Sequence, residues 1–301
     1  MRSALAAIAW LAIASPALAF QAQPAPVQTP APTPAPPPSE TIRYGDAPSQ
    51  IIEVFLPPEP AAGPLPVVVF IHGGCYVSTD ATLQGMRRTY ADLARRGVVV
   101  WGVGYRRTDE AGGAFPGLFQ DIGAATDRVR AEAERLHLDL NRVVVAGHSA
   151  GGHLALWEAG RINLAPTDPL YSPDPLRPRA VVAIAGPGDL APLKDAFNET
   201  CGPEVFDRLV GVPTAARPDV YADTSPVDLL PLALPTWLFV GSRDQVVPLP
   251  LVEAYAEAAR AAGDTVSVRV LVDADHIDVV RSRHAAWAEV ADQLAAAAKG
   301  D

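Results

Sequence analysis

Apolar residues follow two spacings along the chain, and these spacings predict strands and helices in turn. Continuous apolar runs rich in β-branched residues are typical of buried strands, and they occupy residues 50–56, 66–71, 98–101, 142–146, 179–185, 235–240 and 266–272. Apolar positions three or four residues apart predict helices around residues 83–93, 115–138, 152–157, 251–262 and 284–298. Because strands and helices alternate, the sequence predicts an α/β fold with a mostly parallel central sheet and helices on both faces.

One interval, residues 187–231, interrupts this alternation. It is rich in proline and has only weak periodicity. A segment this long that follows a strand of a parallel sheet starts beside the carboxyl ends of the strands, where such folds bind their ligands. We therefore expect a short lid-like insertion that forms one wall of a substrate pocket.

The amino-terminal part of the chain has a different composition. Residues 1–19 contain a short apolar run and a small-x-small site ending at Ala19, which is typical of a secretory signal peptide. The run is too short to cross a bilayer, so we expect export to the periplasm or the medium without stable membrane insertion. Residues 20–40, dominated by Pro, Ala, Gln and Thr, predict a disordered linker. Residues 41–301 then form a single domain.

Charge and cysteine content narrow the possible partners. The chain has 301 residues and a formal net charge of −10, which argues against nucleic acid or an anionic membrane surface as a partner. Its two cysteines are Cys75 and Cys201. In an exported protein they either form a disulfide or remain as two buried thiols.

The segment GHSAG at residues 147–151 stands between a predicted strand and a predicted helix. A G-x-S-x-G segment in this context is typical of a nucleophile elbow. Its glycines allow a sharp turn that exposes the hydroxyl of Ser149, and the helix amino terminus behind it favours negative charge. Ser149 is therefore the predicted nucleophile.

A serine nucleophile needs a base, and the base needs an orienting acid. In folds that have such an elbow, the nucleophile Ser comes first along the chain, the acid Asp or Glu second, and the base His last. Of the six histidines, His276 alone follows a predicted strand by a short loop and comes after a candidate acid, so it is the predicted base. Asp244, at the end of strand 235–240, is the predicted acid, and Asp189 remains an alternative.

A tetrahedral intermediate also needs hydrogen-bond donors for its oxyanion. The loop HGGCY, residues 72–76, follows a strand and has glycines that let its backbone turn inward. We expect the N–H groups of Gly74, Cys75 and Ala150 to be these donors, although a plain strand-to-helix turn would also explain the loop. Three aromatic residues are candidates for the pocket wall, but aromatic side chains are more often part of the core: Tyr76, Phe115 and Trp157.

The motifs HGGCY at residues 72–76 and GHSAGGHL at residues 147–154 together resemble the α/β-hydrolase superfamily. They are most similar to its esterase branch, which includes kynurenine formamidases and BD-FAE-type esterases with H-G-G-x-W and G-x-S-A-G-G motifs. The resemblance extends over about residues 50–298 and includes GSRDQVVP at residues 241–248. It implies an α/β-hydrolase fold and a Ser-Asp-His hydrolase of carboxylic esters or aryl formamides, without a metal or organic cofactor. Tyr76 in place of tryptophan and Cys75 in the loop depart from the pattern.

Three alternatives to an esterase remain. An aryl formamidase would use the same residues, but its intracellular task in this branch fits an export signal poorly. An exopeptidase of the prolyl-oligopeptidase type shares the fold and the elbow, but it would be expected to carry a propeller domain. A non-catalytic binding protein of the same fold usually lacks a residue of the triad, and here all three candidates are present. We therefore expect a small ester or amide as the substrate.

Overall fold

The computed structural model describes residues 34–59, 62–79 and 82–300. The predicted signal peptide and most of the predicted linker lie outside these residues. Of the two compact units into which the chain divides, the second, Ala35–Asp301, contains all the described helices and strands. Its first strand begins at Glu40, and the N–H of Ser39 already donates to the carbonyl of Val54. The folded unit therefore begins before residue 41, where the sequence placed its start.

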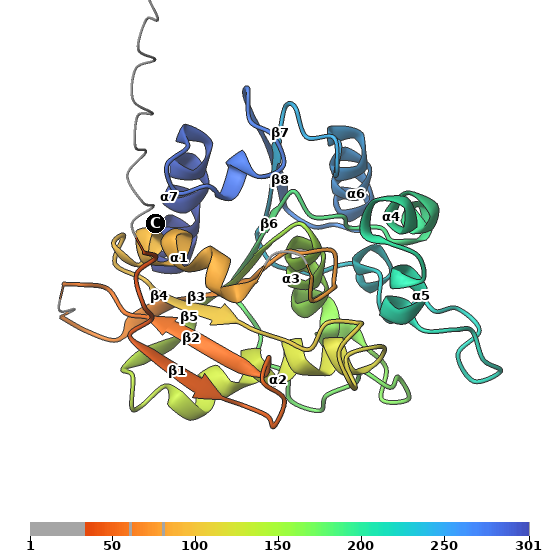
Figure 1. Ribbon diagram of the computed structural model, residues 1–301, viewed down its shortest axis with the longest axis horizontal. Helices are drawn as coiled ribbons and strands as arrows, with labels where there is room; N and C mark the ends of the chain where they lie inside the picture. The colour runs from red at the N-terminus through yellow and green to blue at the C-terminus, as the bar shows by residue number, and fades with distance from the viewer. Residues whose placement is uncertain (1–33, 60–61, 80–81, 301) are drawn as a thin grey trace, which may run out of the picture. The chain divides into compact units, whose positions relative to one another are not determined.

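Eight strands form one sheet at the centre of this unit (Figure 1). In chain order they are β1 (Glu40–Arg43), β2 (Ile51–Phe55), β3 (Leu65–Ile71), β4 (Val99–Val103), β5 (Leu138–His148), β6 (Ala180–Ile184), β7 (Thr236–Gly241) and β8 (Val266–Leu271). Their order across the sheet is β1-β2-β4-β3-β5-β6-β7-β8. The pairs β1–β2 and β2–β4 are antiparallel and all the others are parallel. The predicted α/β-hydrolase fold with its mostly parallel sheet is thus confirmed.

Helices cover both faces of the sheet, as the alternating pattern predicted (Figure 1). They are α1 (Arg87–Ala94), α2 (Gly117–Glu132), α3 (Ala150–Gly160), α4 (Lys194–Cys201), α5 (Val205–Val210), α6 (Leu249–Ala261) and α7 (Ala285–Lys299). Short 3₁₀ turns occur at Leu83–Met86, Arg161–Asn163, Ala191–Leu193, Pro226–Leu229 and Asp278–Val280. The apolar sides of α1 and α7 pack on one face, and those of α2, α3 and α6 pack on the other. No helix within the described residues is both long enough and apolar enough to cross a bilayer.

The register of the parallel strands brings their carboxyl ends to one edge of the sheet. Ile71 at the end of β3 lies opposite Gly147 of β5, and His148 lies opposite Ile184 of β6. Gly241 at the end of β7 lies opposite Leu271 of β8 in the same way. The loops that follow these strands therefore meet at this edge, although they are far apart in the sequence.

Two elements differ from the sequence-based expectation. The helix predicted over residues 115–138 is shorter, because His137 has a left-handed backbone (φ 56°) and β5 already begins at Leu138. Leu136 therefore lies in a turn and Leu138 in a strand, although their spacing suggested a continued helix. The insertion at residues 187–231 contains two short helices, α4 and α5, rather than unpatterned chain.

Candidate active site

The sharp turn between β5 and α3 places Ser149 at its tip. Ser149 has φ 56° and ψ −122°, a strained conformation for a residue with a side chain, of the kind found at functional sites. A Cβ atom built on Gly147 would lie 2.0 Å from the carbonyl oxygen of Gly151, and one built on Gly151 would lie 2.1 Å from that of Ile71. Both flanking positions must therefore be glycine for the chain to turn here.

The three residues predicted as nucleophile, base and acid form one hydrogen-bonded chain. Ser149 Oγ lies 2.9 Å from His276 Nε2, and His276 Nδ1 lies 2.8 Å from Asp244 Oδ2. A carboxylate only accepts hydrogen bonds, so Nδ1 carries the proton and Nε2 is left to accept one from the Ser149 hydroxyl. This is the tautomer that a general base requires.

The acid is held from its other side by the backbone of its own loop. Asp244 Oδ1 accepts the N–H groups of Val246 at 2.9 Å and Val247 at 2.8 Å, and the Asp244 side chain is completely buried. The alternative acid, Asp189, instead accepts the N–H of Ala191 in its own turn. The structure therefore places Asp244, and not Asp189, against the imidazole of His276.

His148 holds the base in place, a role that the sequence did not predict beyond packing or substrate contact. Its Nε2–H donates to the backbone carbonyl of His276 at 2.7 Å, and the two rings lie 4.8 Å apart. Burial lowers the pKa of His148 to about 3, so it adds no positive charge beside His276 at neutral pH. Its position next to the nucleophile, inside the elbow, is the one signal in the sequence that could have indicated this role.

The loop predicted to hold the oxyanion donors packs directly against the nucleophile. A Cβ atom on Gly73 would lie 3.1 Å from that of Ser149. Gly74 and Cys75 follow with φ of 117° and 49°. Within the described part of the chain, the N–H groups of Gly74, Cys75 and Ala150 have no acceptor. These three N–H groups are therefore free to donate to a new partner, which is what an oxyanion site requires.

A disulfide fixes this loop from outside. Cys75 is bonded to Cys201, with their Cα atoms 5.3 Å apart. The sequence allowed either a disulfide or two buried thiols, and the structure has the disulfide. Because Cys201 is the last residue of α4, the bond ties the loop after β3 to the insertion after β6.

Two of the three aromatic pocket candidates belong to the core. Tyr76 and Trp157 are each 1% exposed, and they donate hydrogen bonds to His153 Nδ1 and to the carbonyl of Asp223. Every residue of α3, Trp157 included, is buried, and the cavity that Trp157 lines contains none of Ser149, His276 and Asp244. Phe115 is partly exposed, but its ring faces the guanidinium of Arg217, and the cavity that it lines is formed mainly by α5 and the segment that follows it.

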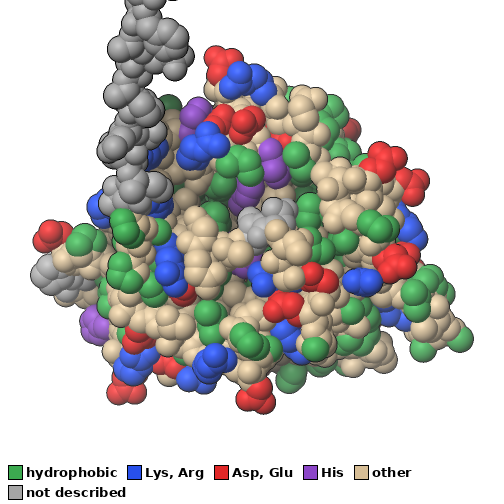
Figure 2. Space-filling model, in the orientation of Figure 1, with side chains coloured by type: hydrophobic (Ala, Val, Ile, Leu, Met, Phe, Trp, Pro, Cys, Tyr) green, Lys and Arg blue, Asp and Glu red, His purple; other side chains and the backbone are tan. Residues whose placement is uncertain are grey.

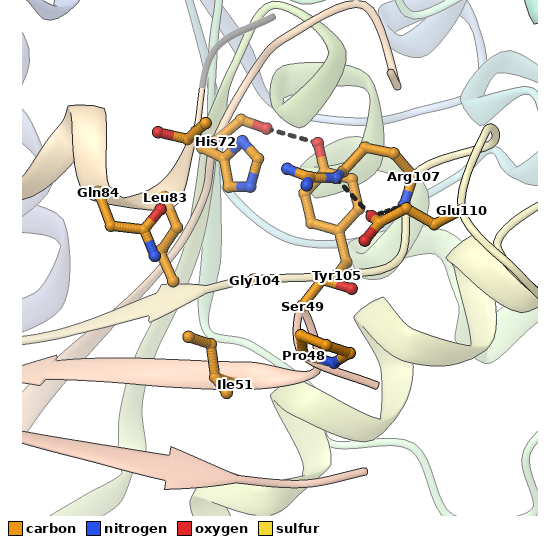
Figure 3. Close-up of a pocket in the computed structure, with 11 residues that line it drawn as sticks. Pro48, Ser49, Ile51, His72, Leu83, Gln84, Gly104, Tyr105, Arg107 and Glu110 are labelled. Atoms are coloured by element: carbon orange, nitrogen blue, oxygen red, sulfur yellow. Dashed lines mark hydrogen bonds and ion pairs between the residues drawn. The ribbon is translucent and has the colours of Figure 1, made fainter. Parts of the chain in front are cut away.

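A further cavity, of about 190 Å³, lies beside His72 at the start of this loop (Figure 3). His72 Nδ1–H donates to the carbonyl of Gly73 at 2.6 Å, and the hydroxyl of Tyr105 donates to the carbonyl of His72 at 2.9 Å. Burial lowers the pKa of His72 to about 4. The ring is therefore neutral at neutral pH, and its hydrogen bond to Gly73 fixes it against the backbone of the loop.

On the face shown in Figure 2, histidine side chains lie in a hollow with hydrophobic side chains beside it. Val246 and Ile277, which follow the acid and the base in sequence, are 42% and 49% exposed. Among residues 34–59, 62–79 and 82–300, no group of three His, Cys, Asp or Glu side chains is arranged to hold a metal ion.

The pH dependence of stability can be tested at His153. Its Nδ1 accepts the hydroxyl of Tyr76 and its Nε2–H donates to the carbonyl of Thr224, and burial lowers its pKa to about 4. The unfolded chain takes up this proton below about pH 6.5. Between these values the unfolded state binds more protons, so the His153 contribution to the free energy of unfolding should fall by up to about 3 kcal/mol as pH drops from 6.5 to 4.

Urea unfolding of the wild type and of His153→Gln at pH 7.0, 5.5 and 4.5 measures this contribution. Glutamine can retain both hydrogen bonds but does not titrate. The stability advantage of the wild type should shrink on acidification, and parallel pH profiles for the two proteins would contradict the expectation.

The fold and the Ser149–His276–Asp244 geometry together define the α/β-hydrolase class. Within it, the family model described as BD-FAE matches residues 52–258, and the chain belongs to this family.

Similar proteins agree with this classification. Esterase LipC of Mycobacterium tuberculosis is 30% identical over 73% of this chain and 54% of its own length. A structure titled "Truncated form of carbohydrate esterase from gut microbiota" has the same fold, with a TM-score of 0.68 and 20% identity over 87% of this chain and 97% of its own. A structure of Thermogutta terrifontis esterase 2 has a TM-score of 0.67 and 21% identity, and the match covers 84% of this chain and 91% of the esterase chain. The chain spans about half the length of the curated relatives it matches.

Proposed function

We propose that this protein is a serine hydrolase that cleaves carboxylic esters through an acyl-enzyme intermediate. The hydrogen-bonded chain from Ser149 through His276 to Asp244 is the observation that carries the proposal. An isolated serine hydroxyl is a poor nucleophile at neutral pH, and a base aligned by a buried carboxylate is what activates it. Membership of the BD-FAE family and the esterase names of the similar proteins support esters as the substrate class.

In the first step Ser149 Oγ attacks the acyl carbon while His276 Nε2 takes the hydroxyl proton. Negative charge develops on the former carbonyl oxygen, and in this proposal the N–H groups of Gly74, Cys75 and Ala150 donate hydrogen bonds to it. Asp244 keeps the imidazole oriented and stabilises its positive charge.

Collapse of this first tetrahedral intermediate then breaks the bond between the acyl carbon and the alcohol oxygen. The alcohol leaves with the proton from His276 Nε2, and Ser149 stays acylated. A water molecule then gives a proton to His276 and attacks the same carbon. Collapse releases the carboxylic acid and restores the Ser149 hydroxyl.

A substrate panel tests this function against its alternatives. A fluorophosphonate probe, which reacts rapidly only with an activated serine, should label the protein. p-Nitrophenyl esters should be hydrolysed with higher kcat/KM than N-formylkynurenine or a dipeptide naphthylamide. Higher kcat/KM for the formamide or the naphthylamide would favour formamidase or exopeptidase function, and the absence of labelling would favour a binding protein.

We also propose that the protein is exported and that residues 1–19 are removed on export. The Cys75–Cys201 disulfide supports this, because structural disulfides form and persist in oxidising compartments. Amino-terminal sequencing of the mature protein should begin at Phe20, and a mature chain that retains Met1 would contradict cleavage.

A further inference from the structure

Resting on the proposed ester hydrolysis, we propose that an apolar cavity beside α4 is the acyl pocket. In this proposal it binds unbranched aliphatic acyl groups of up to about six carbons, and residues of α4 and α6 set that limit.

The cavity has a volume of about 180 Å³ and lies between α4 and the segment that leads from β7 into α6. Figure 1 shows α4 next to α6. Seven of its nine lining residues are nonpolar, and they include Ala196, Phe197 and Cys201 of α4 and Val246 and Leu251 on the opposite side. A lining of this kind favours a hydrocarbon chain over a charged or hydroxylated group.

Two residues of the cavity wall are connected directly to the proposed catalytic residues and the oxyanion loop. Cys201 is covalently bonded to Cys75 of the oxyanion loop, and the ring of Phe197 lies 6.3 Å from that of Tyr76. Val246 donates its N–H to the carboxylate of Asp244. The wall of the cavity is thus bonded to the oxyanion loop through Cys201 and hydrogen-bonded to the acid through Val246.

The chemistry of the reaction assigns this cavity to the acyl group rather than to the alcohol. The acyl carbon carries the oxygen that must face the oxyanion loop, and one wall of the cavity is bonded to that loop. The leaving oxygen must instead lie against His276 Nε2, which gives it a proton. The alcohol therefore lies on the side of the exposed Ile277, next to His276.

The volume sets the chain length. A cavity of about 180 Å³ holds about six groups of the size of a water molecule or a methylene. Each methylene that moves from water into the pocket should raise kcat/KM about fourfold. We expect this rise from acetate through butyrate to hexanoate and no further gain for octanoate or decanoate, whose ends would extend into solvent.

Ala196→Phe tests the assignment by filling the cavity. Ala196 is exposed on α4, so a larger side chain should not disturb the core. kcat/KM for p-nitrophenyl hexanoate should fall at least about tenfold, because two or more methylenes would no longer be buried. kcat/KM for p-nitrophenyl acetate should stay within about twofold of the wild-type value. Ala261→Phe, at an exposed position of α6 away from the cavity, is the matched control and should leave the whole chain-length profile unchanged.

Leu251→Ala enlarges the same cavity and should move the optimum to a longer acyl chain. The inference is overturned if Ala196→Phe lowers acetate and hexanoate turnover equally, or if both Ala196→Phe and Leu251→Ala keep the wild-type profile. In those cases the acetate turnover of the wild type still supports ester hydrolysis. Failure to hydrolyse any ester would instead overturn the proposed function, and the acyl pocket with it.

Discussion

Replacement of Ser149 by alanine is expected to lower the kcat for p-nitrophenyl acetate by at least about 10³-fold. The change removes the one oxygen that lies 2.9 Å from His276 Nε2, so no acyl-enzyme can form. The fold should be unaffected, because alanine keeps the Cβ atom and the turn at φ 56° depends on the flanking Gly147 and Gly151. Steady-state kinetics, circular dichroism and the Tm of the variant measure both parts of the expectation.

Ser282→Ala is a matched control for this experiment, since Ser282 lies in the turn before α7 and outside the hydrogen-bonded chain. It should retain wild-type kcat and fluorophosphonate labelling, whereas Ser149→Ala should lose both. Turnover near the wild-type value in a correctly folded Ser149→Ala protein would remove Ser149 from the mechanism.

Loss of the Cys75–Cys201 disulfide is expected to destabilise the protein by up to about 5 kcal/mol. The bond joins residues 126 positions apart, so without it the unfolded chain gains the freedom of a long open loop. α4 depends on this bond more than the other helices do, because none of its residues is fully buried. Urea unfolding of Cys75→Ser/Cys201→Ser beside the oxidised wild type measures the difference.

The same variant should also have a lower kcat, because Cys75 is held at φ 49° in the oxyanion loop by its bond to α4. The wild type treated with dithiothreitol is the control for the substitutions themselves and should approach the variant in both stability and kcat. Equal urea midpoints for the oxidised wild type and the double variant would contradict the expected stabilisation.

The sequence alone determined the main strands, the helix-covered sheet, the serine and the histidine of the hydrogen-bonded chain, and two candidates for its acid. These follow from local physics. A short apolar run with three consecutive valines, such as residues 142–146, favours a buried strand. The glycines around Ser149 are required by a turn that brings a Cβ position within 2.1 Å of a carbonyl oxygen. His276, Asp244 and Asp189 became candidates because each follows a strand, and parallel strands end at one edge.

Other features could be decided only by the tertiary structure, because they depend on contacts between distant segments of the chain. The choice between Asp244 and Asp189 required knowing which carboxylate faces His276. Exposure could not be inferred from residue type, so Trp157 is part of the core while Val246 is open to solvent. The pairing of Cys75 with Cys201 brings together two loops 126 residues apart. Apolar periodicity reports whether a position is buried, but it does not report which partner a side chain meets, and the partner is fixed only when the whole chain packs.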